Sequence, residues 1–185
     1  MKKIILTVAV VFAIGIVSAQ ETRFGVKGGL NIASITKSDG ASSLIGFHVG
    51  FFAELKVSEK FTLQPEVLYS IQGAKDSGIT LNLGYINLPI MAKYYVAKDF
   101  SLELGPQIGF LVAAKAKSGG ESASVKDFIK STDFGLNIGA GYDVGENLIF
   151  GLRYNLGLSQ VQQDLDAGES ASKNAVFSVS VGYKF

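Results

Sequence analysis

The sequence has no cysteine, no tryptophan, one histidine and three prolines in 185 residues. The lack of cysteine excludes disulfides, thiolate metal sites, a cysteine nucleophile and the lipid-modified cysteine of a bacterial lipoprotein. The single histidine, His48, leaves few partners for acid–base catalysis. The 17 basic and 16 acidic residues nearly balance, which predicts no bulk attraction to nucleic acid. We therefore expect neither an enzyme nor a nucleic-acid-binding protein, and no cofactor.

The N-terminus has the pattern of a secretory signal. Two lysines precede an apolar run over residues 4–17, and small residues lie around Ala19. This run is shorter than the roughly 20 residues that a membrane-spanning helix needs. We expect residues 1–19 to be a signal peptide cleaved between Ala19 and Gln20, and residues 20–185 to form one domain.

The remainder is rich in glycine, with 22 residues, and in aromatic residues, at 11%, a bias that favours strands and tight turns. Apolar residues alternate with small or polar ones, which is typical of strands with two unlike faces. Near the C-terminus, Phe177, Val179 and Val181 alternate with Ser178 and Ser180. We expect an all-β fold with eight strands, at about 23–34, 44–57, 61–72, 79–97, 100–113, 132–144, 148–160 and 174–185.

The connections between these segments alternate in length. Residues 58–60, 98–99 and 145–147 form very short turns, whereas the other connections are medium or long, at 35–43, 73–78, 114–131 and 161–173. Short turns on one rim and long loops on the other are typical of bacterial outer-membrane barrels, which also have an even number of strands. The sequence therefore predicts an eight-stranded antiparallel up-and-down transmembrane β-barrel in a Gram-negative outer membrane. Both mature termini then lie in the periplasm.

One face of each strand is almost purely apolar, and the other carries charged residues and most of the glycines. Glycine suits a narrow interior in which side chains from opposite walls must fit. We therefore place the polar face in the lumen and expect its charges to pair across a closed interior, because an unpaired buried charge costs several kcal/mol. The predicted interior network contains Lys27, Glu54, Lys56, Glu66, Lys93, Glu103, Asp133, Asp143, Arg153 and Lys184.

Aromatic residues lie close to the short-turn ends of the strands. Tyrosine and phenylalanine at this level are expected to form an interfacial girdle, with outer-membrane lipid as its partner. The predicted girdle contains Phe61, Tyr94, Phe100, Tyr142, Tyr183 and Phe185. The terminal aromatic strand resembles the signal that the barrel assembly machinery reads.

The apolar positions of the segment 79–97 change parity between Leu83 and Ile86. A β-bulge near Gly84 would explain the change, since one extra residue shifts every following side chain to the other face. The pairs Gly28-Gly29 and Gly119-Gly120 lack the pattern of a phosphate-binding loop. We interpret them as sites of backbone fitting and loop flexibility.

Three short motifs resemble the PorT-like outer-membrane β-barrel family of Bacteroidota. They are Phe24-Gly25-Val26-Lys27-Gly28-Gly29-Leu30-Asn31, Leu63-Gln64-Pro65-Glu66-Val67-Leu68-Tyr69-Ser70 and Tyr85-Ile86-Asn87-Leu88-Pro89-Ile90. The resemblance covers the whole mature chain and implies a small barrel similar in build to OmpA and OmpX, with a location but no chemistry.

We expect a structural or surface-interaction protein, monomeric, whose outer loops meet an unidentified protein or polysaccharide. Two functional alternatives stay open: a narrow solute channel, and a lipid-modifying or proteolytic enzyme with His48 and a loop acid such as Asp39 at the rim. A soluble lipocalin-like barrel with the faces inverted is the alternative fold. The last long loop also offers carboxylates for a divalent cation, at Asp164, Asp166 and Glu169.

Overall fold

The computed structural model describes residues 21–36, 42–76, 78–162 and 172–185. Several predicted features lie outside the described residues. They are the predicted signal peptide with its cleavage site between Ala19 and Gln20, the candidate rim acid Asp39, and the loop acids Asp164, Asp166 and Glu169. Among the described residues, no helix is long and apolar enough to cross a membrane.

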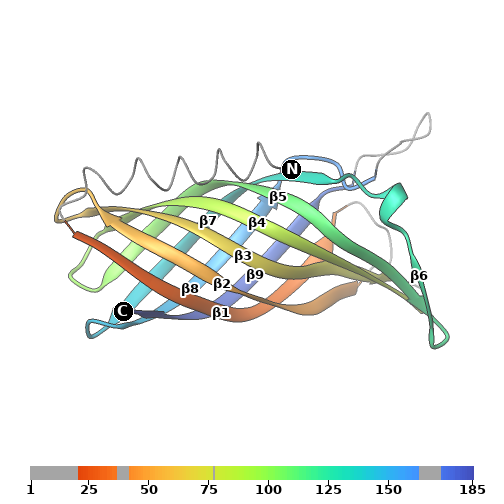
Figure 1. The fold of residues 1–185 in the computed structure, drawn as a ribbon, viewed down its shortest axis with the longest axis horizontal. Coiled ribbons are helices and arrows are strands. Elements are labelled where there is room, and N and C mark those ends of the chain that lie inside the picture. The colour runs from red at the N-terminus through yellow and green to blue at the C-terminus, as the bar shows by residue number, and fades with distance from the viewer. Residues whose placement is uncertain (1–20, 37–41, 77, 163–171) are drawn as a thin grey trace.

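Eight strands form the wall of a closed antiparallel β-barrel (Figure 1). The strands pair in chain order, and β4 with β5 and β1 with β9 complete the ring. The predicted fold is therefore confirmed. The wall strands are β1 (Glu21–Ile35), β2 (Ser42–Lys56), β3 (Phe61–Asp76), β4 (Ile79–Tyr95), β5 (Phe100–Ser118), β7 (Thr132–Val144), β8 (Leu148–Gly157) and β9 (Asn174–Lys184).

The two rims of the barrel differ, as the connection lengths predict. Short turns and the C-terminus lie at one end, which we call the turn rim, and β6 lies toward the opposite end, the loop rim (Figure 1). The strand β6 (Glu121–Ser124) pairs with β5 alone, and a short 3-10 helix, η1 (Lys126–Phe128), follows it. Sequence patterning did not predict β6, because its four exposed residues have no apolar face.

The joint between β5 and β6 is a two-residue hairpin, not a flexible loop. Gly119 and Gly120 have φ angles of +56° and +90°. A two-residue hairpin with positive φ at both central positions requires residues that tolerate this conformation, and glycine does so without steric cost. The pair therefore extends β5 five residues beyond its predicted end at residue 113.

The faces of the wall are sorted with the apolar side outward. Leu30, Leu102 and Leu152 are 62%, 51% and 51% exposed, whereas Glu66 and Lys93 are 1% and 0% exposed. A soluble barrel would show the opposite arrangement, because water favours charged residues outside and apolar residues in the core. The lipocalin-like alternative is therefore wrong.

The predicted bulge exists, but it lies in the neighbouring strand. The pairing of β4 with β5 shifts between Gly84 and Tyr85, whose partners are Ala113 and Leu111, so Val112 is the extra residue. In β4 itself, Leu83 is fully buried, although the sequence pattern places it outside. The prediction of a bulge within β4 is therefore wrong. The same alternate residues of β4 face inward along the whole strand, and near the loop rim these inward residues are apolar instead of polar.

These inward apolar residues form a small hydrophobic core that closes the loop rim. Leu83 and Tyr85 from β4 pack with Leu111 from β5. Ile129 and Val161 reach this cluster from the connections after η1 and after β8. An isolated bridge between Ile129 and Gln162 ties these two connections together. The described parts of these two connections thus pack against the wall at the loop rim.

Candidate functional site

The inward positions of the wall bring eight charged side chains together inside the barrel. Glycine makes room for them, because a narrow lumen cannot hold a large side chain at every inward position. Gly139 lies in register between Glu103 of β5 and Arg153 of β8. A Cβ atom at Gly139 would meet the carbonyl oxygen of Leu152 at 2.6 Å. This gap allows Arg153 to reach Glu103 at 3.1 Å.

Glu66 is the centre of the network. Arg153 donates one hydrogen bond of 2.9 Å to each of its carboxylate oxygens. Lys27 donates a third at 2.9 Å, and the amide of Gln64 a fourth at 2.6 Å. Charge-assisted bonds of this kind, and the bidentate arginine pair above all, are the strongest polar contacts that proteins make.

A second group of ion pairs continues the network toward the turn rim. Lys93 lies 2.7 Å from Glu54 and 3.8 Å from Glu103, so it connects the two groups. Lys184 contacts Glu54 at 3.4 Å and Asp143 at 2.9 Å. The hydroxyl of Tyr95 donates to Asp143 at 3.0 Å.

The network is balanced in charge and crosses the lumen. It joins four cations to four carboxylates without a break, from Lys27 at one end to Asp143 at the other. Mutual pairing offsets the desolvation of each charge, whereas removal of one partner leaves a buried charge without compensation. The network therefore fills the interior and holds the wall strands to one another.

Two of the ten predicted network residues lie outside this group. Lys56, the last residue of β2, is exposed at the turn rim. Asp133 lies near the start of β7 toward the loop rim, where Ser159 donates to it at 2.7 Å and Asn174 at 3.2 Å. The alternation of side chains placed both residues on the inward face. Lys56 lines the opening at the turn rim together with Glu54 and Lys184, whereas Asp133 lies at a different height along the barrel, which alternation does not give.

Above the charges, toward the loop rim, the interior is lined by amides and hydroxyls. Asn155 donates to Asn137 at 3.0 Å, and Asn137 donates to Gln107 at 3.2 Å. The amide of Asn31 donates to Ser70 at 3.0 Å. The layer encloses a cavity of about 40 Å³. Sequence reasoning missed this layer because it considered only charged residues, although the inward parity of the amides would have revealed it.

His48 belongs to the amide layer. Its Nδ1 atom lies 2.8 Å from the side-chain oxygen of Asn31, and the residue is buried. The acid suggested as its partner, Asp39, lies outside the described residues. The described residues contain no group of three or more histidine, aspartate or glutamate side chains arranged to hold a metal ion.

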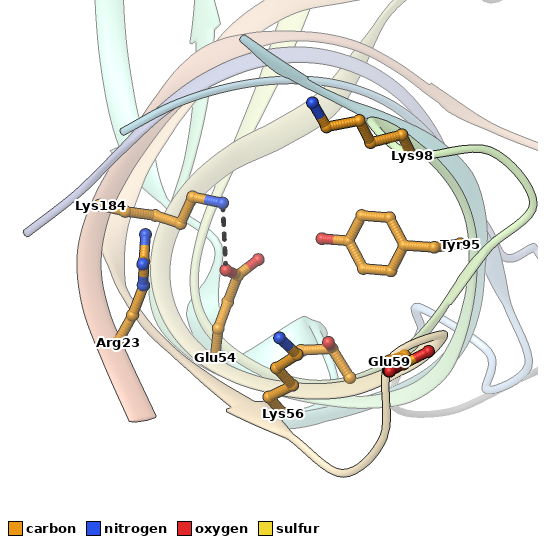
Figure 2. Close-up of a pocket in the computed structure, with 8 residues that line it drawn as sticks. Arg23, Glu54, Lys56, Glu59, Tyr95, Lys98 and Lys184 are labelled. Atoms are coloured by element: carbon orange, nitrogen blue, oxygen red, sulfur yellow. Dashed lines mark ion pairs between the residues drawn. The ribbon is translucent and has the colours of Figure 1, made fainter. Parts of the chain in front are cut away.

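The turn rim opens into a polar cup of about 210 Å³, whose lining includes Lys98, Tyr95 and Glu59 (Figure 2). The ion pair between Lys184 and Glu54 spans part of the cup (Figure 2). These two residues also belong to the interior network, so the cup ends at that network.

The six predicted girdle residues lie on the outer face near the turn rim. Phe61 pairs with Tyr94 across β3 and β4, and Phe100 pairs with Tyr142 across β5 and β7. The rings of Tyr183 and Phe185 meet edge to face, with centroids 5.8 Å apart. Five of the six are exposed, and Phe61 is half-buried.

Several solved structures share this fold. Neisserial surface protein A has 19% sequence identity and a TM-score of 0.59, over 91% of this chain and 99% of that protein. Ail of Yersinia pestis, in complex with the heparin analogue sucrose octasulfate, has 19% identity and a TM-score of 0.54, over 90% and 100%. A major outer membrane protein of Thermus thermophilus has 14% identity and a TM-score of 0.53, over 90% and 100%.

No curated protein matches the sequence. A family model does: residues 18–163 match the outer membrane protein beta-barrel domain. The match covers most of the chain and agrees with the closed ring of strands and with the apolar outer wall. The chain therefore belongs to the family of outer membrane proteins that carry this beta-barrel domain.

Proposed function

We propose that this protein is a plugged outer-membrane barrel that acts as a structural or surface-interaction protein through its loop rim, not as a pore or an enzyme. The observation that carries the proposal is the unbroken set of ion pairs between Lys27 and Asp143. An eight-stranded barrel has an interior just wide enough for side chains to fill. An ion that crossed it would have to separate paired buried charges, and leaving such charges without partners is costly.

Conductance of the purified protein in a planar bilayer tests the plug. We expect the wild-type protein to give no current above that of the bare bilayer. Discrete, reproducible conductance steps would contradict the proposal and favour the narrow solute channel. A variant with Glu66→Ala and Arg153→Ala removes the centre of the plug and is expected to pass more current. Lys98→Ala, at the exposed turn rim, serves as the control and stays silent.

The proposed orientation has both mature termini and the short turns in the periplasm, after export with a signal peptide cleaved between Ala19 and Gln20. The chain has no cysteine, so single introduced cysteines report orientation without background. Ser118→Cys, at the end of β5, is expected to react with a membrane-impermeant maleimide on intact cells, and Ser58→Cys, in a short turn, only after lysis. The reverse pattern would overturn the orientation.

The proposed partners are outer-membrane lipid around the wall, the barrel assembly machinery at the C-terminal strand, and a protein or polysaccharide at the loop rim. The aromatic positions near the turn rim support an interfacial girdle on the periplasmic side. We propose a monomer, because the ring closes on itself through β1 and β9 and leaves no wall edge unpaired.

Within its family, we assign the chain to the PorT-like branch. The assignment rests on the motifs at residues 24–31, 63–70 and 85–90. The first two of these motifs supply Lys27 and Glu66, which form an ion pair of 2.9 Å.

We also propose that His48 has a packing role. Its Nδ1 atom lies 2.8 Å from the side-chain oxygen of Asn31, and the residue is buried among the amides of the interior. His48→Ala is therefore expected to leave unchanged any hydrolytic or acyl-transfer activity that the purified protein shows on outer-membrane lipids or peptides. Loss of such an activity in the variant would revive the enzyme alternative.

A further inference from the structure

We propose that the loop rim carries a binding site for phosphate groups borne on a saccharide, on the outward face of the sheet that β3, β4, β5 and β6 form beyond the apolar wall. The site is a lysine platform built from Lys75, Lys115 and Lys117. The proposal deepens the surface-interaction role and rests on the proposed orientation, because it requires the loop rim to lie at the cell surface.

The β-bulge at Val112 sets the direction of two of these lysines. In β5 the odd-numbered residues before the bulge, such as Gln107 and Leu111, are buried inside the barrel. Without the extra residue, Lys115 and Lys117 would share their inward direction, because strand side chains alternate. With it, Ala114 is buried and both lysines are exposed. Bulges commonly re-aim a side chain in this way.

Strand register places the platform in two rows across the sheet. One row joins Lys75 of β3, Thr80 of β4, Lys117 of β5 and Ser122 of β6. The next row contains Asn82, Lys115 and Ser124. Register partners share a face, and neighbouring strands are about 4.8 Å apart. The three ammonium groups therefore start from backbone positions roughly 7 to 12 Å apart, close enough for the long lysine side chains to engage one multiply charged ligand.

The platform contains donors and no acid. Between the lysines lie hydroxyl and amide groups, which complete a polyanion site by hydrogen bonding. The carboxylates of the same sheet, Asp76 and Glu121, occupy the opposite parity, because their register partners are Ile79 and Ser118. Within the described part of the chain, no ion pair of 4.0 Å or less is formed by Lys75, Lys115 or Lys117.

The height of the platform suggests its ligand. Val112 is the last exposed apolar residue of β5 before the lysines. Lys115 lies three residues further along, about 10 Å at the rise of a β-strand. The polar headgroup layer on each side of a bilayer is roughly 5 to 8 Å thick. The platform thus faces sideways at the level of the outer-leaflet headgroups, where a phosphorylated glycolipid presents clustered phosphates on sugar.

Two sources supply this chemistry: the headgroup of an outer-leaflet glycolipid, and a soluble phosphorylated saccharide. The test uses the full-length protein in zwitterionic lipid nanodiscs. One arm adds fluorescent diphosphorylated lipid A to the nanodisc and measures energy transfer from a dye on the protein. The other adds inositol hexakisphosphate, a soluble polyphosphate, and measures binding by calorimetry.

The critical variant is Lys115→Gln with Lys117→Gln, and its matched control is Lys60→Gln with Lys98→Gln, two exposed lysines at the turn rim. Each lysine near an anionic surface adds favourable binding free energy, so the variant that lacks two lysines is expected to lose roughly thirtyfold in affinity. The control is expected to keep wild-type affinity, and added salt is expected to weaken wild-type binding. Deletion of Val112 is expected to weaken binding as the double variant does.

The arms separate the outcomes. Lysine-dependent enrichment of lipid A alone assigns the site to the membrane headgroup, and lysine-dependent binding of the soluble probe assigns it to free phosphosaccharides. Absence of wild-type binding in both arms, or equal losses in both double variants, overturns the proposal. Nanodiscs expose both rims to the solution, so the binding measurements do not depend on which rim lies at the cell surface. Failure of Ser118→Cys labelling on intact cells would overturn the proposed orientation separately.

Discussion

Arg153 of β8 and Glu66 of β3 form a bidentate ion pair across the lumen, with two nitrogen–oxygen distances of 2.9 Å. The two residues are not on neighbouring strands, so the pair spans the interior. The carboxylate of Glu66 has no exposure to solvent, and the side chain of Arg153 is 11% exposed. Loss of one partner of a buried pair destabilises a protein far more than loss of one partner of a surface pair, because the remaining buried charge is left without compensation.

Replacement of the arginine tests this contribution. Arg153→Met leaves the buried carboxylate of Glu66 with Lys27 and Gln64 only, and we expect a loss of about 3 to 5 kcal/mol in unfolding free energy. Urea unfolding, followed by the electrophoretic mobility of unboiled samples, measures it. Lys98→Met, at the exposed turn rim, is the control and should change little. Equal urea midpoints for Arg153→Met and Lys98→Met would contradict the stabilising role of the pair between Arg153 and Glu66.

The pair is also expected to be strongly coupled. Glu66→Leu alone leaves the buried Arg153 with Glu103 as its remaining carboxylate partner. The double variant of Glu66→Leu and Arg153→Met removes both charges together, so it should be less destabilised than the sum of the two single variants. A double-mutant cycle in urea gives this difference. Additive losses would show that the two residues act independently.

Two adjacent glycines in β1 provide a matched test of the narrow interior. Gly29 faces inward, and a Cβ atom there would collide with the carbonyl oxygen of Val179 and approach the ring of His48 at 2.7 Å. Gly28 faces outward, where the nearest atom to such a Cβ would lie 3.6 Å away.

We therefore expect Gly29→Ala to destabilise the barrel by about 1 to 3 kcal/mol through overpacking, and Gly28→Ala to be close to neutral. The fraction of protein that folds into detergent micelles, and the urea midpoint of that fraction, measure both. A Gly29→Ala protein as stable as Gly28→Ala would argue against close packing at this level.

The hydrophobic core at the loop rim predicts a local effect. Leu111→Ala removes buried contacts with Leu83 and Tyr85, and substitutions of this type cost about 2 to 5 kcal/mol. Because the wall below stays paired, we expect faster protease cleavage in residues 119–131 while the mobility of the unboiled barrel is unchanged. Cleavage at the wild-type rate would show that the cluster does not hold this connection in place.

The strands and their faces were predictable because alternation has a period of two and the membrane sorts every position. Apolar residues with period two had to face lipid, and glycine with charge had to face the lumen. This rule placed Glu66, Arg153 and Lys93 inside without knowledge of any partner. It misplaced Leu83, because the inward face becomes apolar where the connections close the rim.

The partners within the lumen were not predictable from the sequence. Glu66 and Arg153 are 87 residues apart, and they meet because the stagger of the closed ring sets the height of each inward residue. Alternation gives the direction of a side chain and not its height. For the same reason Asp133 was grouped with charges from which it is separated along the barrel. The position of the extra residue was not predictable either. The sequence of β4 does not show which of the two paired strands contains the bulge, and only the observed register assigns it to β5.

The seam between β1 and β9 joins the first and last strands of the domain, with Gly25 opposite Lys184. The ring therefore cannot close until β9 has been synthesised and reaches β1. Until then, β1 and β9 each have one edge with unpaired backbone groups. Other protein chains in water can pair with these groups, and lipid cannot form hydrogen bonds with them. On the proposed export route, the chain must stay open and soluble during this interval, which ends when β9 pairs with β1.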